Sequence, residues 1–412
     1  MTDRPATVAL PRADRTDWWM VVLALGLGAL AAYQQFKLPP VLPLLLDAYG
    51  YERVFAGGFM SIYAAVGLAL SAVIGATIER QGFRRALVAS GACFLAGSGL
   101  TMIAPALAPV VLVARGIEGV GFAILAVLAP VLATGAATPR HLPMAIAIFA
   151  AWIPTGQLVA TMLAVPIAGA GEWRPLWWIG IGLTIVLGLI AWRRTGRVSA
   201  HITVGGRLRL ARLQWLGLIL NAAVFTLWST ELFAFMTWLP TYLVEQRGLS
   251  FADMQWPYAV PVAGILVFSI FGGYLLRAGI SFITLMVTGL GLQAAVWFAM
   301  PWLGDPAVGL LAVALFGVGA GITPTGLFAG PSAMLGQASA RGLAYGIIMT
   351  GRNTGVLLGP VLLPLVHDWL TSWEGTGRVF GGVAALGALS AGGLGLIAAR
   401  IGAATSPQAA KR

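Results

Sequence analysis

The sequence predicts an all-α membrane protein in which twelve transmembrane helices form two pseudo-symmetric six-helix halves. Hydrophobic residues make up 59% of the 412 residues and charged residues 9%, against about 25% charged residues in soluble domains. The mean hydropathy is +0.88. The apolar residues gather in about twelve runs of roughly 20 residues, the length that a helix needs to cross a bilayer. These runs are about twice as long as a membrane β-strand. Membrane-spanning helices therefore account for nearly the whole chain.

The apolar runs divide the chain in order. The predicted spans of the first half are 18–40, 54–78, 86–104, 110–134, 144–167 and 176–192. Those of the second half are 213–243, 257–276, 282–300, 307–327, 343–366 and 379–399. The predicted domains are an N-terminal tail 1–17, a first half 18–192, a central loop 193–212, a second half 213–400 and a C-terminal tail 401–412.

The basic residues predict the orientation, because Lys and Arg gather in cytoplasmic loops. With both termini in the cytoplasm, 18 of the 25 Lys and Arg residues lie on that side. The outer loops then hold only Arg53, Arg174, Arg247 and Arg378. The net charge of +11 is thus a topology signal, and we expect no nucleic-acid partner. The polar segment 1–17 leads directly into a full-length span, so we expect no cleavable signal peptide. We expect a multi-pass protein of a bacterial inner (plasma) membrane with the lipid bilayer as its partner.

The residues that commonly carry enzyme chemistry are sparse. The single cysteine, Cys93, excludes a disulfide framework, and His141, His201 and His367 are scattered over loops. No nucleophile–base pair or metal-ligand cluster is visible at membrane depth. The sequence therefore predicts a protein that is not an enzyme and holds no cofactor or metal.

A short segment between spans two and three, "GATIERQGFRR", carries a motif. With one extra residue, Phe83, it resembles the G-x3-[DE]-R-x-G-[RK]-[RK] signature of the major facilitator superfamily. The matching residues are Gly75, Glu79, Arg80, Gly82, Arg84 and Arg85. A tight basic turn explains Arg84 and Arg85 alone, but it does not explain the acid and both glycines. The resemblance implies a cytoplasmic latch that gates the transport cycle.

A partial copy of this motif, "GGYLLRAG", recurs in the second half, where Gly272, Arg277 and Gly279 repeat the spacing and Leu276 replaces the acid. The resemblance covers essentially the whole chain. It implies two six-helix halves, alternating access and a small-molecule substrate bound near the membrane midplane between the halves, in a protein that works as a monomer. The phrases "MTWLPTYLVEQRGLS" and "PVLPLLLDAYG" are similar to the cyanate permease branch, whose members handle small anions and other small solutes.

The fourth span contains "RGIEGVG", which matches the R-x2-Q-G-x-G pattern of the superfamily's fourth helix. Arg115, Gly119 and Gly121 match, and Glu118 stands where glutamine is common. Residues three apart share a helical face, so Arg115 and Glu118 are predicted to form a charge pair close to the middle of the membrane.

Three cations, Lys37, Arg115 and Arg352, lie inside apolar runs. Each costs roughly 2.5–3.5 kcal/mol at membrane depth, so we expect them to be functional. Arg352 lies nine residues into span eleven, next to Asn353 and on the same face as Tyr345. We predict that these three residues face the central cavity and bind substrate. The alternative is a structural bond from Arg352 to helix carbonyls or to an acid of the opposite half.

Lys37 permits two interpretations. Pro39 and Pro40 follow it, so it can be an interfacial lysine at the end of the span. Alternatively, Tyr33, Gln34 and Lys37 share one face of the first span and offer a cation with two hydrogen-bonding groups to the substrate.

Two acids are candidate proton carriers: Glu118, together with Arg115, and Glu231 in span seven. Desolvation favours the neutral form of an unpaired carboxyl group, which suits a proton carrier, but Glu231 can equally be a structural partner of a cation. Gln157 in span five is a candidate substrate contact or a helix–helix contact.

The balance of three cations to two acids at membrane depth favours an anionic solute. The sequence therefore predicts a secondary active transporter for a small, anionic solute, driven by proton-coupled uptake. The alternative is a proton-driven exporter of drugs or metabolites. Such exporters usually carry G-x3-G-P-x2-G-G in span five, which "AAWIPTGQLVATM" lacks, although "GVLLGPVLL" in span eleven has some similarity to it.

Overall fold

The computed structural model of the chain describes residues 15–138, 140–141, 144–145, 148–149, 151–195, 210–302, 306–335 and 342–405. Within these ranges, the side chains of 71–81, 342–343, 345 and 403–405 lie outside the described part. The predicted tails and central loop fall largely on residues that are not described.

The described residues are almost entirely helical. The first half contains α1 (Trp18–Phe36), the 3-10 turn η1 (Pro39–Val41), α2 (Leu42–Tyr49), α3 (Arg53–Gln81), α4 (Phe83–Ile103), α5 (Ala108–Gly135), α7 (Trp152–Gly169) and α8 (Arg174–Arg194). The second half contains α9 (Arg212–Glu245), α10 (Gln255–Arg277), α11 (Phe282–Phe298), η2 (Met300–Trp302), α12 (Pro306–Leu335), α13 (Gly342–Leu370) and α14 (Trp373–Thr405). Among the described residues, 11 helical segments are long and apolar enough to cross a membrane, and α11 is a shorter apolar helix. The predicted fold class is confirmed.

Several predicted spans have different limits in the structure; α12, for example, runs to Leu335 and not to the predicted 327. The first apolar segment does not end at Pro40 but runs to Tyr49 through η1 and α2. Pro39 and Pro40 interrupt the backbone hydrogen bonds without reversing the chain, since proline has no N–H. The last helix begins at Trp373, before the predicted 379. Glu374 and other polar residues of its first turns interrupt the apolar pattern, so the sequence did not predict this start.

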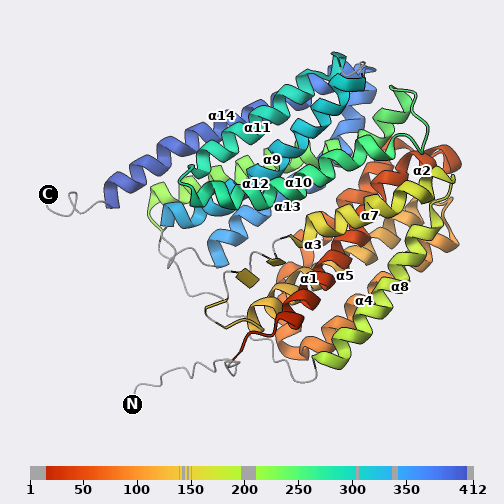
Figure 1. The fold of residues 1–412 in the computed structure, drawn as a ribbon, viewed down its shortest axis with the longest axis horizontal. Coiled ribbons are helices and arrows are strands. Elements are labelled where there is room, and N and C mark those ends of the chain that lie inside the picture. Colours follow the sequence, from red (N-terminus) through yellow and green to blue (C-terminus); the bar gives the residue numbers. More distant parts are fainter. Residues whose placement is uncertain are drawn as a thin grey trace.

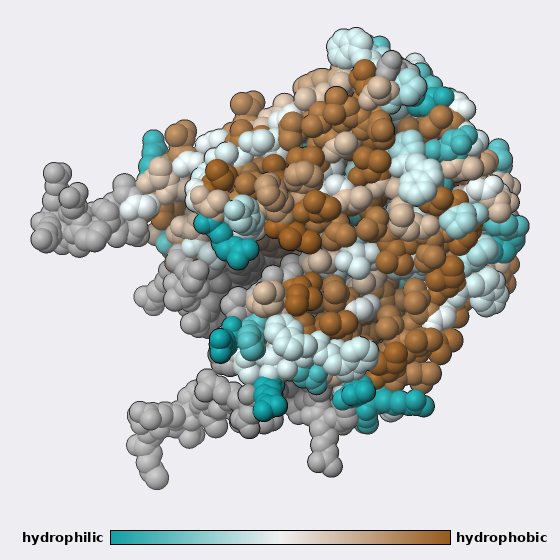
Figure 2. Space-filling model, viewed as in Figure 1, coloured by the Kyte–Doolittle hydropathy of each residue, from teal (hydrophilic) through white to brown (hydrophobic). Residues whose placement is uncertain are grey.

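The two halves are separate bundles that meet at one end (Figure 1). Contacts between them run from α3 to α13, from α7 to α10, and from η1 and α2 to α9. We call the end formed by α2, Arg53 and Glu245 the closed end. Figure 1 shows the bundles diverging toward the opposite end, where α1 begins and α14 finishes. Hydrophobic residues cover much of the visible face, and hydrophilic residues lie mainly near its margins (Figure 2).

Small residues permit the closest helix contacts. A Cβ atom added at Gly351, Gly355 or Gly359 would lie 2.2–2.3 Å from a carbonyl oxygen of α9, so the backbones of α13 and α9 touch directly. Gly57 of α3 makes the same kind of contact across the two halves, because an added Cβ would lie 2.1 Å from the Pro360 carbonyl oxygen. These contacts fix the position of α13, the helix that carries Arg352.

Candidate functional site

Lys37, Arg115 and Glu118 form a buried charge cluster in the first half. Arg115 Nη1 lies 2.6 Å from Glu118 Oε2, and Lys37 Nζ lies 2.8 Å from Glu118 Oε1. The side chains of all three residues are 0% exposed. The predicted Arg115–Glu118 pair is confirmed, whereas the interfacial position considered for Lys37 is wrong, because its ammonium group is enclosed by protein.

Neighbouring side chains complete the hydrogen bonds of this cluster. Glu118 also accepts from the Tyr63 hydroxyl at 2.8 Å and from the Ser98 hydroxyl at 2.6 Å. Lys37 donates to Glu118, to Ser98 Oγ at 2.9 Å and to Gln34 Oε1 at 2.6 Å, which uses the three donors of an ammonium group. The cluster is fully satisfied without a ligand.

Arg115 also caps the break in the first span. It donates from Nη1 to the Gln34 carbonyl and from Nη2 to the Gln35 carbonyl, both at 2.8 Å. In a continuous helix, the N–H four residues later would bond the Gln35 carbonyl, but that residue is Pro39 and has no N–H. Arg115 supplies the missing donor. The sequence signal for this role, a proline four residues after Gln35, was visible but pointed to no partner.

Tyr33 and Gln34 turn toward α8 within the first half. The Tyr33 hydroxyl donates to the Leu176 carbonyl at 2.7 Å. Gln34 Nε2 donates to the Gly180 carbonyl at 3.0 Å and to Thr184 Oγ1 at 3.1 Å. The structure therefore brings Tyr33, Gln34 and Lys37 together, as expected from their shared face, and places their polar atoms on partners inside one half.

Arg352 lies on α13 near the junction of the halves. Its guanidinium lies 5.8 Å from the ring centroid of Phe233, and that ring lies 5.9 Å from the ring of Phe36 in the first half. Its Nη1 donates to Asn353 Oδ1 at 3.1 Å. No carboxylate of the described residues lies within 4.0 Å of Arg352. The side chain of Tyr345, predicted beside it, lies outside the described part.

Two polar residues, Gln157 and Tyr258, lie on the helices that form the α7–α10 contact between the halves. Gln157 on α7 is 4% exposed, and Tyr258 on α10 is 0% exposed. The two side chains lie close together, yet neither Gln157 Nε2 nor the Tyr258 hydroxyl has a hydrogen-bond partner among the described residues. Tyr258 was not anticipated from the sequence, since a tyrosine in an apolar run gives no sign of what it faces.

Glu231 lies inside the second half with neutral partners. Its carboxyl group accepts from Trp297 Nε1 at 2.9 Å and from Gln293 Nε2, both on α11. The residue is 0% exposed, and no cation of the described residues lies within 4.0 Å of it. The structural alternative, a bond to Lys37, Arg115 or Arg352, therefore does not occur. The sequence could not indicate the α11 partners, because they lie about sixty residues away.

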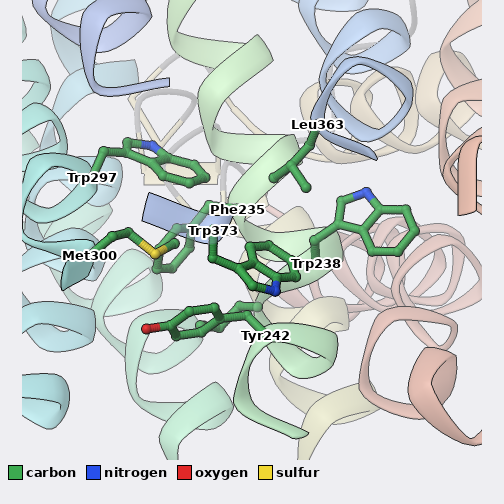
Figure 3. Close-up of a pocket in the computed structure, with 8 residues that line it drawn as sticks. Phe235, Trp238, Tyr242, Trp297, Met300, Leu363 and Trp373 are labelled. Atoms are coloured by element: carbon green, nitrogen blue, oxygen red, sulfur yellow. The ribbon is translucent and has the colours of Figure 1, made fainter. Parts of the chain in front are cut away.

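Trp297, a hydrogen-bond partner of Glu231, also lines a small aromatic cavity. Figure 3 shows Trp297 with other large side chains around a cavity of about 10 Å³. Its lining residues are Phe235, Trp238, Leu239, Tyr242, Trp297, Met300, Leu363 and Trp373. A cavity of this size holds one water molecule at most. It offers no room for a solute.

The predicted gating loop is a tight turn between α3 and α4. Gly82, with φ of +82°, joins Gln81 to Phe83, and this conformation strains residues that carry a Cβ. The first three motif residues lie in the helical backbone of α3. They are Gly75, Glu79 and Arg80, and their side chains lie outside the described part.

The basic residues of this loop behave differently from each other. Arg84 Nη2 donates to the Trp192 carbonyl at 2.9 Å, and its guanidinium lies 4.7 Å from the Trp192 ring centroid. Arg85 is exposed. Arg84 therefore ties the start of α4 to the end of α8, while Arg85 is free to meet solvent or lipid headgroups.

The family is settled by comparison with known proteins. The family model described as Major Facilitator Superfamily matches residues 24–338. This chain belongs to the major facilitator superfamily. No curated protein sequence gives a significant match.

Solved transporter structures share the fold. One is a D-xylose–proton symporter, with TM-score 0.71, 15% identity, 90% of this chain and 96% of that chain covered. Another is a bacterial homologue of the human lysosomal transporter Spinster in an inward-facing and occupied conformation, with TM-score 0.69, 15% identity, and 95% and 97% coverage. The same homologue, inward-facing and unoccupied, gives TM-score 0.68, 14% identity, and 94% and 95% coverage. The chain is thus a multi-pass membrane protein and a secondary transporter by family and fold.

Proposed function

We propose that this transporter carries a small anionic solute by alternating access and that Arg352 binds the anion. The observation that carries the proposal is a cation between the halves with no acidic partner in the described part of the chain. A guanidinium has five N–H donors, and Asn353 takes one of them. The remaining donors form the planar fork that matches a carboxylate or a similar oxyanion.

Lys37 and Arg115 already have their hydrogen-bond donors occupied within the first half. Glu118 neutralises one charge of the buried charge cluster, and the donors of Lys37 all have acceptors. We therefore leave Tyr33, Gln34 and Lys37 out of the proposed anion site. Gln157, with Tyr258, remains a proposed neutral contact, because Gln157 Nε2 and the Tyr258 hydroxyl have no partner within the described residues.

Glu231 is the proton carrier in this proposal. Two cations hold Glu118, whereas only neutral donors contact Glu231. Gln293 can serve both protonation states of Glu231, because an amide offers N–H donors on one side and an oxygen acceptor on the other. Its Oε1 atom has no partner among the described residues, so turning the amide over would let a protonated Glu231 donate to it.

The proposed direction of transport is uptake. The closed end is proposed to face outward. Basic residues mark the opposite end: Arg84 and Arg85 begin α4, Arg193 and Arg194 end α8, and Arg277 ends α10. Lys and Arg favour the cytoplasmic side. Solute accumulation by cells that carry the protein tests the direction, because an uncoupler should lower accumulation by a proton-driven importer and raise it if the protein exports.

A ligand screen tests the substrate class directly. Purified protein in detergent should show a higher thermal unfolding midpoint with small carboxylates or inorganic anions than with neutral compounds of matched size, because a ligand that binds only the folded protein stabilises it. Stabilisation by neutral or cationic compounds alone would contradict the anion proposal.

Glu231→Gln is expected to separate exchange from proton-driven accumulation. The amide keeps the shape of a protonated acid but carries no titratable proton. In proteoliposomes, the variant should exchange internal for external anion at a rate near that of the parent, using the anion with the largest thermal shift, and should lose accumulation driven by a proton gradient. Glu374→Gln, at an exposed acid paired with Arg378, is the matched control and should behave like the parent. Retained accumulation by Glu231→Gln would remove Glu231 from coupling.

A further inference from the structure

An ion pair joins the two halves at the closed end. Arg53, the first residue of α3, places Nη2 at 2.8 Å and 2.9 Å from the two carboxylate oxygens of Glu245, the last residue of α9. The side chains are 33% and 36% exposed. Of the ion pairs between described residues, this is the one that crosses from the first half to the second.

Arg53 also reaches a second helix of the opposite half. Its Nη1 lies 3.3 Å from Nδ1 of His367, near the end of α13. The same imidazole nitrogen also lies 3.5 Å from Asp368 Oδ1, and it accepts in the contact with Arg53, because an arginine can only donate. The imidazole ring is held against Trp373, with ring centroids 4.6 Å apart. One side chain of the first half thus contacts the ends of both α9 and α13.

The two halves also touch through their backbones next to Arg53. One turn further along α3, Gly57 lies directly on the Pro360 carbonyl of α13. A second contact between the halves joins η1 to α10, where Gln255 Nε2 donates to the Pro40 carbonyl at 3.0 Å. Arg53 therefore sits on top of a contact between halves that has to separate if the closed end is to open.

We propose that Arg53 is the gate residue of the closed end. Its contacts with Glu245 and His367 stabilise the closed arrangement, and their loss accompanies opening. The inference rests on the alternating access of the proposed function. An exposed ion pair contributes little to folding, up to about 1 kcal/mol. In a transporter whose open and closed states are close in free energy, however, the same contribution shifts their ratio by up to about fivefold.

The test measures the opening of the closed end by cysteine labelling. Thr241 lies one turn inside Glu245 on α9 and is 1% exposed, so Thr241→Cys in a Cys93→Ala background reports opening. Purified protein in detergent is treated with a hydrophilic maleimide. Arg53→Glu and Glu245→Arg should each raise the initial labelling rate by about fivefold or more, since each replaces attraction by repulsion. The double variant Arg53→Glu/Glu245→Arg should return the rate toward the parent value.

Two further variants keep the result interpretable. Glu245→Gln removes the charge with little change of shape and should raise the rate less than Glu245→Arg does. Arg378→Glu breaks the exposed Arg378–Glu374 pair within α14, and it should leave the rate unchanged. Equal labelling of the parent and both single reversals overturns the proposal, as does a double variant that labels as fast as the single ones. Labelling needs no solute and no gradient, so a failed anion or proton proposal would leave this result intact.

Discussion

Arg352→Ala is expected to abolish anion binding while leaving the protein folded. Truncating one partner of a buried charge pair costs about 2–5 kcal/mol, which corresponds to a loss of affinity of about 30-fold or more. Among the described residues, the polar and cation–π partners of Arg352 are Asn353 and the Phe233 ring, and neither is an acid, so its loss should not lower the thermal unfolding midpoint. Binding of the best anion from the screen, measured by its thermal shift, and uptake of that anion give the two readouts.

The matched variant for this prediction is Arg352→Lys. Lysine keeps the charge but lacks the planar fork of donors, so intermediate affinity is expected. Arg378→Ala removes an exposed arginine of α14 and should bind and transport like the parent. Normal uptake by Arg352→Ala would remove Arg352 from the substrate site. A marked fall in its unfolding midpoint would instead support the structural alternative, a bond that holds α13 in place.

Arg115→Ala is expected to destabilise the protein more than any single change at the surface. Breaking a buried ion pair typically costs about 3–5 kcal/mol. The change also leaves the Gln34 and Gln35 carbonyls without the donors that Arg115 provides. The thermal unfolding midpoint in detergent should fall clearly, whereas Arg378→Ala should shift it little, because exposed pairs contribute up to about 1 kcal/mol.

Lys37→Met isolates the capping role of Arg115. Each of the two variants leaves Glu118 with one cation, but only Arg115→Ala opens the backbone at the break in the first span. Arg115→Ala should therefore lower the midpoint more than Lys37→Met does. An equal fall for the two variants would show that the ion pairs, and not the backbone cap, determine the stability of the cluster.

Glu231→Gln tests a different property from the Arg352 variants. Arg352 concerns whether the anion binds, whereas Glu231 concerns whether its movement is linked to a proton. A protein with Arg352 intact and Glu231 replaced should still equilibrate its solute. The two roles are assigned to different places in the second half: Arg352 on α13 lies beside Phe233, whose ring meets Phe36 of the first half, and Glu231 on α9 faces α11.

The predicted fold followed from features that are local in sequence. The length of each apolar run predicts a membrane helix, because a bilayer of fixed thickness demands about 20 apolar residues. The order of the helices, the family motif around Gly82 and the Arg115–Glu118 pair also depend only on nearby residues. Helix ends were less accurate, as at Tyr49 and Trp373, because prolines and charges interrupt the apolar pattern without ending the helix.

The partners of the buried charges required the tertiary structure. Helical periodicity shows which residues share a face, but it does not show what that face meets. Lys37 thus lay on the predicted face with Gln34, yet its acid partner is on α5. From the sequence, Arg53 was one of a few outer basic residues, and the packing of the two halves places it against Glu245, far away along the chain.

By itself, the sequence determined that this protein is a twelve-helix membrane transporter and that a few charged residues lie at membrane depth. Only the tertiary structure decided which of those charges are compensated. The physical reason is that the free energy of a buried charge depends on partners within a few ångströms, and helix packing brings those partners together from distant parts of the chain. Glu118 meets two cations, Glu231 meets neutral donors, and Arg352 meets no acid among the described residues.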